Sequence, residues 1–361
     1  MKLFIVGGLI LSTLILFNFQ KSITGTGPVE TQTYNISEFS SFDISGDLKV
    51  SLNIGDEYLV QVTTNENIFD YLDISVKNNV LIYELKPDIN IKDTSIHMHV
   101  VCPKISNIDL AARAEMSILD PIECSELSIN MSSLSNLLAS NFTIDNSATI
   151  KMSSGSKMSI SDIFKCSDLY IDIGSSANLS SANLKVDNNT NIELSSSADM
   201  NISDMFECSH LDIDMNSSAN LSVANFKVDN NTDIELSSST NMNISDTFEC
   251  SSLDIDMHSK AKLTANNVNV KACEIKGTSS SELHLVGDTP KLYLDLSSSA
   301  TALLSNFIVE NAEVKLSSSA QTEINATNNI YLDGSSGSEI TIYNGNLILA
   351  DKYNGATINR K

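Results

Sequence analysis

The sequence contains no tryptophan, and aromatic residues make up only 6% of its 361 residues. Basic residues are also scarce, because 22 Lys and Arg stand against 45 Asp and Glu, which gives a formal net charge of −23 at pH 7. A strongly negative surface repels nucleic acid and anionic membrane surfaces. We therefore exclude nucleic-acid binding and expect membrane contact only through an uncleaved N-terminal segment.

Motifs that carry catalytic chemistry are missing as well. The chain has no CxxC pair for zinc, and no G-x-S-x-G, H-E-x-x-H or phosphate-binding loop. Its five histidines do not cluster in a pattern that provides three metal ligands. The sequence therefore predicts a protein that is not an enzyme and has no catalytic residues, no metal site and no cofactor.

The N-terminus resembles a targeting segment. Lys2 precedes a nearly continuous apolar run from Leu3 to Phe17, which fits a signal peptide and is short for a membrane span of ~20 residues. We assign residues 1–24 to a signal peptide or an N-terminal anchor, and both alternatives remain open. The chain is expected to be exported to the periplasm, the cell surface or the extracellular space.

An internal duplication dominates the middle of the chain. The 42-residue segments that start at Cys166 and Cys208 are identical at roughly three-quarters of their positions, and Cys124 and Cys250 keep the same spacing. Each segment contains two related halves. Ile171-Asp172-Ile173 is followed by a Gly-Ser-Ser turn, and Ile192-Glu193-Leu194 is followed by three serines. The structural period is therefore about 21 residues.

This period predicts an all-β fold, a right-handed parallel β-helix with rungs of about 21 residues. The apolar residues alternate at i, i+2 and i+4 in each repeat, which is the spacing of strands and not of helices. Weaker copies extend the regular β-helix over residues 106–349, with 11 or 12 rungs at ~4.8 Å each. Residues 25–105 are expected to form an N-terminal β cap with irregular first rungs, and residues 350–361 a C-terminal tail.

Stacking of equal rungs places equivalent residues in columns. One column carries an acidic residue between two apolar ones, so strand alternation places it on the outside. Its most regular members are Asp172, Glu193, Asp214, Glu235 and Asp256. We interpret this column as a hydrated acidic stripe. The alternative is a ligand or cation site, most plausibly for Ca²⁺, although one column supplies few of the six to eight oxygens that Ca²⁺ prefers.

A second column consists of serines at the end of the first strand of each rung. Its most regular members are Ser175, Ser196, Ser217, Ser238 and Ser259. Alternation predicts that these side chains point inward, where a small hydroxyl turns the chain and bonds to neighbouring backbone. No histidine recurs beside them to act as a base, so their predicted role is structural.

The cysteines are predicted to be small buried residues. Members of the 42-residue column stand two rungs apart, about 9.6 Å, which is beyond the ~7 Å limit for a disulfide. Cys102 with Cys124, and Cys250 with Cys273, are about one rung apart, so disulfides at these two places remain open.

The residues before the β-helix resemble the start of a known family. The segments are Ile23 to Val29, Phe39 to Gly46, Leu48 to Val50 and Asn78 to Ile82. They are similar to the autotransporter-adhesin head domain, also called the GIN domain, and the resemblance covers roughly residues 36–345. It implies an exported β-helix of Bacteroidetes-like bacteria with a suggested role in adhesion, and no catalytic residues.

Three functions follow as alternatives. The first is an adhesin-like surface or periplasmic module that presents a repetitive acidic face to a glycan, a matrix component or a cell surface. The second is a polysaccharide lyase or glycoside hydrolase, which would need carboxylates converging in a cleft. The third is a purely structural spacer. The scarcity of aromatic platforms for sugar stacking argues against the second.

Overall fold

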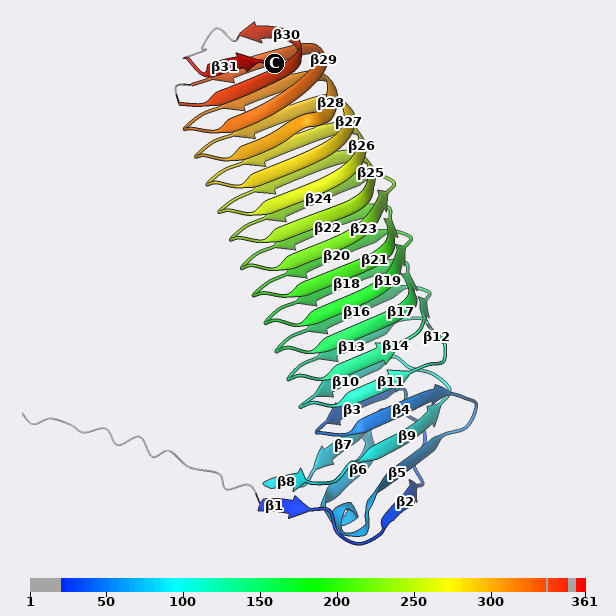
Figure 1. Ribbon diagram of the computed structural model, residues 1–361. Helices are drawn as coiled ribbons and strands as arrows, with labels where there is room; N and C mark the ends of the chain where they lie inside the picture. Colours follow the sequence, from blue (N-terminus) through cyan, green and yellow to red (C-terminus); the bar gives the residue numbers. More distant parts are fainter. Residues whose placement is uncertain (1–20, 336, 350–354) are drawn as a thin grey trace, which may run out of the picture.

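The computed structural model describes residues 21–335, 337–349 and 355–361. These residues form a long stack of β-strands that stands on a broader N-terminal region (Figure 1). The stack is a β-solenoid of about 12 turns, with rungs about 21 residues apart, as the sequence predicts. Residues 1–20 of the predicted signal peptide or anchor lie outside the described residues, and its last four residues form β1 (Lys21–Thr24).

The N-terminal region combines parallel and antiparallel strands. Its elements are β2 (Val29–Tyr34), β3 (Ser41–Ser45), β4 (Lys49–Ile54), β5 (Leu59–Asn65), the 3₁₀-helix η1 (Glu66–Tyr71), β6 (Leu72–Lys77), β7 (Val80–Leu85), β8 (Ile89–Lys92) and β9 (His97–Cys102). Strands β3 and β4 form the first rung, because they pair in parallel with β10 and β11 on one side and with β7 and β9 on the other. Antiparallel β2, β5 and β6 complete this region below the first rung.

The rungs follow one plan through the stack. The first ones are built from β10 (Asn107–Ala111), β11 (Glu115–Ile118), β12 (Ile122–Cys124), β13 (Leu127–Met131), β14 (Asn136–Ala139), β15 (Phe142–Ile144), β16 (Ser147–Met152) and β17 (Lys157–Cys166). The duplicated segments supply β18 (Asp168–Ile173), β19 (Asn178–Val186), β20 (Asn189–Leu194), β21 (Asp199–Cys208), β22 (His210–Met215), β23 (Asn220–Val228) and β24 (Asn231–Leu236).

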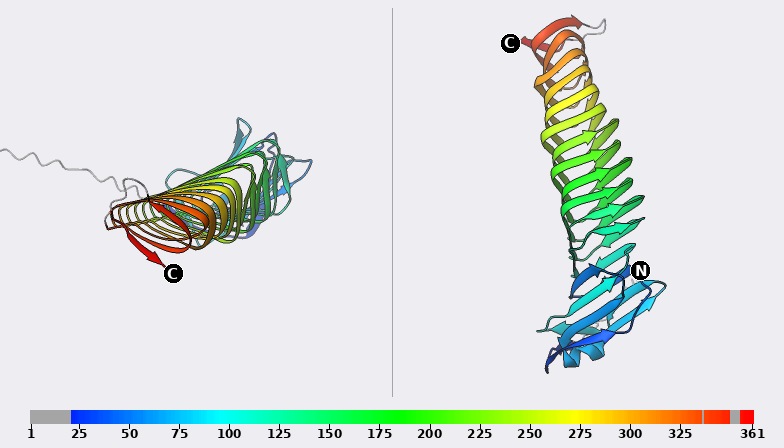
Figure 2. Two further views of the ribbon diagram at one scale, coloured as in Figure 1. Left: turned by 90° about the horizontal axis from the view of Figure 1, so that it is seen from above. Right: turned by 90° about the vertical axis from the view of Figure 1, so that its right-hand side faces the viewer.

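Strands near the C-terminus run without a break around the corner between rungs. They are β25 (Asn241–Met257), β26 (Lys262–Gly277), β27 (Glu282–Leu296), β28 (Thr301–Leu316), β29 (Gln321–Gly334) and β30 (Glu339–Leu349), and the short β31 (Thr357–Arg360) follows them. The last of these pairs in parallel with β30, so the segment expected to be a tail adds a strand to the stack. Viewed along its axis, the solenoid has a flattened outline (Figure 2).

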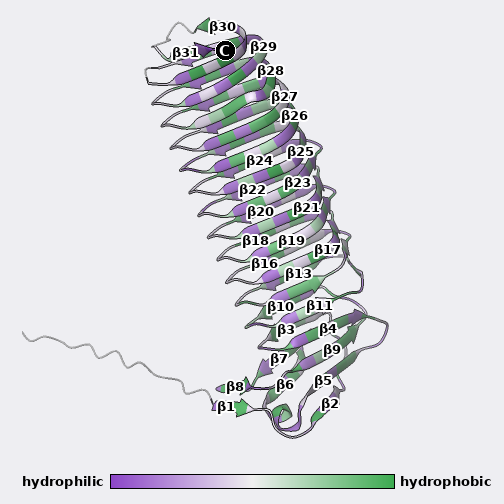
Figure 3. Cartoon of the chain, in the orientation of Figure 1, coloured by the Kyte–Doolittle hydropathy of each residue, from purple (hydrophilic) through white to green (hydrophobic). Residues whose placement is uncertain are grey.

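Strand alternation separates the core from the surface. In β22 (His210–Met215), every second residue is buried, namely Leu211, Ile213 and Met215, and the other three are exposed. The same alternation recurs along the stack as stripes of apolar and polar residues (Figure 3). Phenylalanines fill one interior column, where the ring centroids of Phe206 and Phe226 lie 5.0 Å apart and those of Phe226 and Phe248 lie 5.6 Å apart.

Asparagine side chains connect neighbouring rungs at a bend within the second strand. The register shifts there by a β-bulge, for example between Ser181 and Asn183. The amide of Asn183 donates to the carbonyl of Asp162 at 3.3 Å, and that of Asn225 donates to Asp204 at 3.0 Å. Both bonds span 21 residues, so the asparagines satisfy carbonyls of the preceding rung that the bulge leaves free.

The serine column is exposed, so its predicted inward orientation is wrong. All five predicted serines lie in tight turns with φ between +51° and +57°. The residue after each is also left-handed in most rungs, as in Ser175 and Ser176, and the amide of Ala177 closes the turn on Gly174 at 3.1 Å. Two consecutive positive φ values are those of a type I′ turn. Alternation stops at the strand end, and the small inward residue is Ala177 instead.

The turns also bond to each other along the stack. The amide of Ser176 donates to the carbonyl of Ser196 at 3.0 Å, and the amide of Ser197 donates to Ser217 at the same distance. A left-handed conformation is costly for a residue with a Cβ, and short polar side chains tolerate it best. The requirement for such residues at two successive positions explains the serine-rich composition.

All six cysteines are free thiols, so neither of the two disulfides left open by the sequence forms. In register, Cys250 lies opposite Val270 and Cys273 lies opposite Leu253, so the rung spacing does not bring the two thiols face to face. Burial raises the pKa of Cys208 to about 12 and that of Cys124 to about 11. The thiols are therefore protonated at neutral pH and act as small core residues.

Replacing Ser217 by Val should lower the free energy of unfolding by about 1–2 kcal/mol, because a β-branched residue fits poorly at positive φ. Replacing the same residue by Asn should be nearly neutral. Guanidinium unfolding followed by circular dichroism measures both. Ser222→Val is the matched control, since Ser222 points outward from β23, where valine is favoured. Equal losses in the two valine variants would contradict the turn assignment.

Candidate ligand-binding surface

The first strand of each rung presents three outward columns on one face of the solenoid. In β18 these positions are Asp168, Tyr170 and Asp172, between the buried Leu169, Ile171 and Ile173. We call this face the first face. We name its columns after their position in the strand: the corner column (Asp168), the middle column (Tyr170) and the turn column (Asp172).

The five acidic residues predicted to stack lie in the turn column. Register pairs join Asp172 to Glu193, Glu193 to Asp214, Asp214 to Glu235, and Glu235 to Asp256. Glu193, Asp214 and Glu235 are exposed, and the other two are partly buried. The run of acids ends at Asp256, whose Oδ1 lies 2.9 Å from Nε2 of His258 in the adjoining turn. The role of these residues as ligand contacts stays a prediction.

A second set of acids, which the sequence analysis did not single out, lies beside them in the middle column. Asp212, Asp233 and Asp254 are successive register partners, so together with three acids of the turn column they form a block of six carboxylates. We call it the acid block; its members are Asp212, Asp214, Asp233, Glu235, Asp254 and Asp256. The sequence did contain a signal for this block. In Asp212-Ile213-Asp214 the two acids are two positions apart, so strand alternation places both on the outside.

The acid block is electrostatically strained. Burial raises the pKa of Asp212, and the charges of Asp233 and Asp214 raise it further. Burial likewise raises the pKa of Asp254, with a contribution from Glu274. The described part of the chain contains no group of three or more His, Cys, Asp or Glu side chains arranged to hold a metal ion. Calcium at the turn column therefore remains an untested alternative.

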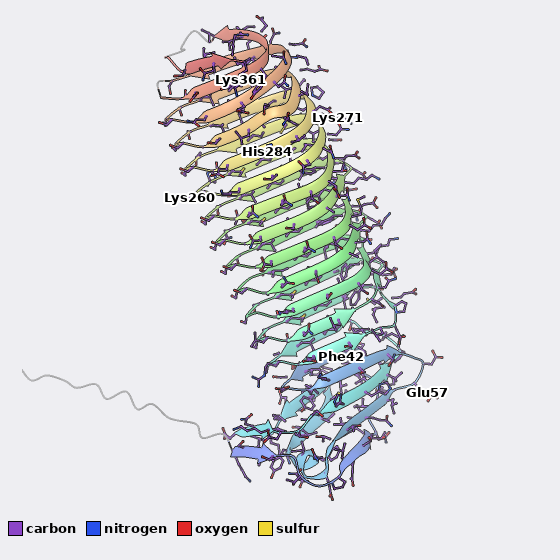
Figure 4. The ribbon with its side chains drawn as sticks, in the orientation of Figure 1. Phe42, Glu57, Lys260, Lys271, His284 and Lys361 are labelled. Carbon is purple, nitrogen blue, oxygen red and sulfur yellow. The ribbon has the colours of Figure 1, made fainter. Side chains whose placement is uncertain are left out.

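A shallow groove of about 410 Å³ lies on the first face beyond the acid block. Its outward lining comes from the corner and middle columns of β25 to β29. It includes Lys291, Tyr293, Asn311, Glu313 and Tyr331. We call it the tyrosine groove. In Figure 4, side chains cover the outside of the stack, and Lys271, which precedes Ala272 of the groove in the chain, lies at its right-hand edge.

Sequence analysis missed the tyrosine groove. Tyr293 and Tyr331 lie in the middle column, on either side of Glu313 in register. They are 38 positions apart, which is two rungs after the repeat has shortened from 21 towards 19 residues. The signal was present in two tripeptides, Tyr293-Leu294-Asp295 and Tyr331-Leu332-Asp333, which match Tyr170-Ile171-Asp172 of the duplicated segment.

A larger hollow of about 500 Å³ lies at the opposite end of the first face. It is lined by Asp43, Asp109, Asn130, Lys151 and Asp172 together with the adjoining turns. Asp109 accepts hydrogen bonds from the amides of Asn130 at 2.6 Å and Asn107 at 2.7 Å. The Asp109 carboxylate is thus occupied by contacts within the chain.

Comparison with known proteins identifies the family. Residues 38–225 and again residues 207–346 match the family model described as "Putative auto-transporter adhesin, head GIN domain". The chain belongs to this family. The two matches overlap within the duplicated segments and together span most of the solenoid, which confirms the resemblance seen in the sequence. None of the curated proteins compared with the chain matches it.

Solved structures with similarity to this GIN-domain protein include several from Bacteroidetes. One, described as a putative adhesin from Bacteroides fragilis, is 13% identical and has a TM-score of 0.46, covering 69% of this chain and 99% of its own. A putative adhesin from Parabacteroides merdae is 13% identical, with a TM-score of 0.35 and coverage of 94% and 99%. A putative lipid binding protein from Parabacteroides distasonis is 14% identical, with a TM-score of 0.30 and coverage of 94% and 100%.

Replacing Asp233 by Asn should stabilise the solenoid at neutral pH and flatten its pH dependence. A carboxyl whose pKa is raised by folding, like that of Asp212, binds its proton more tightly in the folded state. Its contribution to stability therefore falls as pH rises through the raised pKa. Since the Asp212 carboxyl is mostly solvated, we expect the free energy of unfolding to rise by a few tenths to about 1 kcal/mol.

Urea midpoints between about pH 4 and pH 7 measure this effect, a range that spans the titration of carboxyls. Asp333→Asn is the control, because Asp333 lies on the same face with Lys315 as its register partner. That variant should lose stability or stay unchanged at neutral pH. A gain of equal size in both variants would show that lower net charge alone, and not the acid block, is responsible.

Proposed function

We propose that this GIN-domain protein is an exported, non-enzymatic, adhesin-like module that binds an extended surface ligand through its first face. The observation that carries the proposal is the register of that face. Three outward positions repeat in every rung, so polar side chains form straight columns. Successive members of a column lie ~4.8 Å apart along the stack. A surface of this shape suits an elongated, repetitive ligand better than a small molecule.

The distribution of charge supports a binding role and argues against the enzymatic alternative. Acids of the acid block lie in a regular grid on an open face, and the hollow among them measures only about 210 Å³. Glycoside hydrolysis needs two carboxylates that flank one bond from opposite sides. The family description supports adhesion in the same direction. Within the described residues, no helix is long and apolar enough to cross a membrane.

The acidic face is part of this proposal. Its carboxylates keep the rod hydrated and repel anionic surfaces, so they favour contact with neutral or basic partners. The spacer alternative requires only the rod. Direct measurement of adhesion distinguishes the two.

Fluorescent beads that carry the full chain should adhere to at least one surface among immobilised glycans, mucin, collagen and fibronectin. Beads with an unrelated protein of similar net charge should not adhere. Parallel assays with calcium and with EDTA test the cation alternative at the turn column. Absence of adhesion to every surface would leave only the spacer.

Polysaccharide degradation is the outcome that would replace this proposal with an enzyme. The same chain is incubated with a polysaccharide panel, and new reducing ends and unsaturated products are measured. We expect none. Degradation that disappears in the double variant Asp214→Ala, Glu235→Ala, while guanidinium unfolding is unchanged, would place catalysis on the first face.

A further inference from the structure

We propose that the tyrosine groove is the ligand site of the first face and that it binds a neutral, extended oligosaccharide. The inference rests on the proposed binding function and names its ligand class. It assigns contact to a part of the face that differs from the acid block in its aromatic content, its charge and its shape.

Two tyrosines provide the platforms for sugar rings. Tyr331 is 49% exposed, and within the described residues its side chain has no hydrogen bond, ion pair or ring contact. Tyr293 lies two rungs away in the same column, ~9.6 Å along the axis. A sugar unit in an extended glycan is about as long as one rung is high, so alternate units would lie over the two rings. Exposed tyrosine offers an apolar face and a polar tip to such a ligand.

Hydrogen-bonding groups lie beside the rings in the corner column. The Lys291 side chain is exposed and has no acidic partner in the part of the chain that the structure describes. Asn311 accepts a 3.4 Å hydrogen bond from the Asn329 amide through its oxygen, which leaves its N–H donors free. Sugar hydroxyls both donate and accept, so these donors and the carboxylate of Glu313 can fix a saccharide over the tyrosines.

The carboxylates of the groove are paired with lysines. Lys276 pairs with Glu274 at 2.7 Å, and Lys315 pairs with Glu313 at 3.4 Å. Lys315 also donates to the Tyr293 hydroxyl at 3.0 Å and lies 4.8 Å from its ring centroid, which orients that ring. Since Asp254 of the acid block lies one rung below Glu274 of the groove, an anionic polysaccharide along the face would be repelled. A neutral ligand is compatible with both regions.

Small side chains open the groove next to the first tyrosine. Ser252 and Ala272 occupy successive positions of the corner column, where the register places them before Lys291. In the duplicated rungs this column carries the larger His210 and Asn231. The hollow is therefore a local feature of the C-terminal rungs, and not a product of the repeat.

Isothermal titration of the full chain with hexasaccharides tests the inference. The neutral probes are cellohexaose, xylohexaose, mannohexaose and the N-acetylglucosamine hexamer, and the galacturonic acid hexamer is the anionic probe. At least one neutral probe should bind, and the anionic probe should not. Tyr331→Ala should weaken binding about five- to tenfold, the size of one aromatic stacking contact. Tyr331→Phe, which keeps the ring, should bind within about twofold of the native chain.

Tyr170→Ala is the matched control, because Tyr170 lies in the same column on the far side of the acid block. It should bind like the native chain. Equal binding by Tyr331→Ala and the native chain would overturn the assignment of the site. Adhesion of beads without affinity for any neutral hexasaccharide would overturn the ligand class and leave the proposed function intact. Self-association that Tyr331→Ala abolishes in sedimentation would assign the groove to a second copy instead.

Discussion

Parallel hydrogen bonding between successive rungs is the constraint on which the rest of this molecule depends. The backbone N–H and C=O groups of each strand form hydrogen bonds only with the rungs above and below. Each strand residue must therefore lie opposite its equivalent in the next rung. The turns obey the same rule, since the amide of Ser197 reaches the carbonyl of Ser217. Because register is preserved, every position acquires one environment that is repeated along the whole stack. Inward columns become apolar, and turn columns become small and polar.

Register also imposes contacts that electrostatics alone would avoid. Asp212, Asp233 and Asp254 lie one above another because their strands pair, and burial together with the charges of neighbouring acids raises the pKa values of the first and last. The first face relieves this strain beyond Asp256, where Lys276 and Lys315 enter the turn column. Two chemically different regions therefore share one flat face. One is a hydrated acidic grid, and the other is a groove with aromatic rings whose carboxylates are paired with lysines.

The parts of the fold that follow from periodicity could be predicted, and those that depend on local backbone geometry could not. The duplicated segments reveal the rung length, and the alternation in Leu211 to Met215 assigns core and surface correctly. Extending the same inward–outward alternation two residues further, to Ser217, gives the wrong orientation. Ser217 has a left-handed backbone, so the alternation of the strand has already ended there. The groove escaped because it depends on side chains that are locally small, Ser252 and Ala272, and no periodic pattern marks such a feature. The N-terminal 3₁₀-helix Glu66–Tyr71 belongs to no repeat and left no periodic signal.

The similarity of the two 42-residue segments has a consequence for the length of the rod. Each segment contributes two rungs that contact only their neighbours, so a copy can be gained or lost without disturbing the rest of the stack. Such a change would lengthen or shorten the rod by ~9.6 Å. The duplicated rungs lie between the N-terminal region and the tyrosine groove, so copy number determines how far the groove is held from the base. The length of the rod can thus evolve through the number of repeats, independently of the side chains that form the groove at its far end.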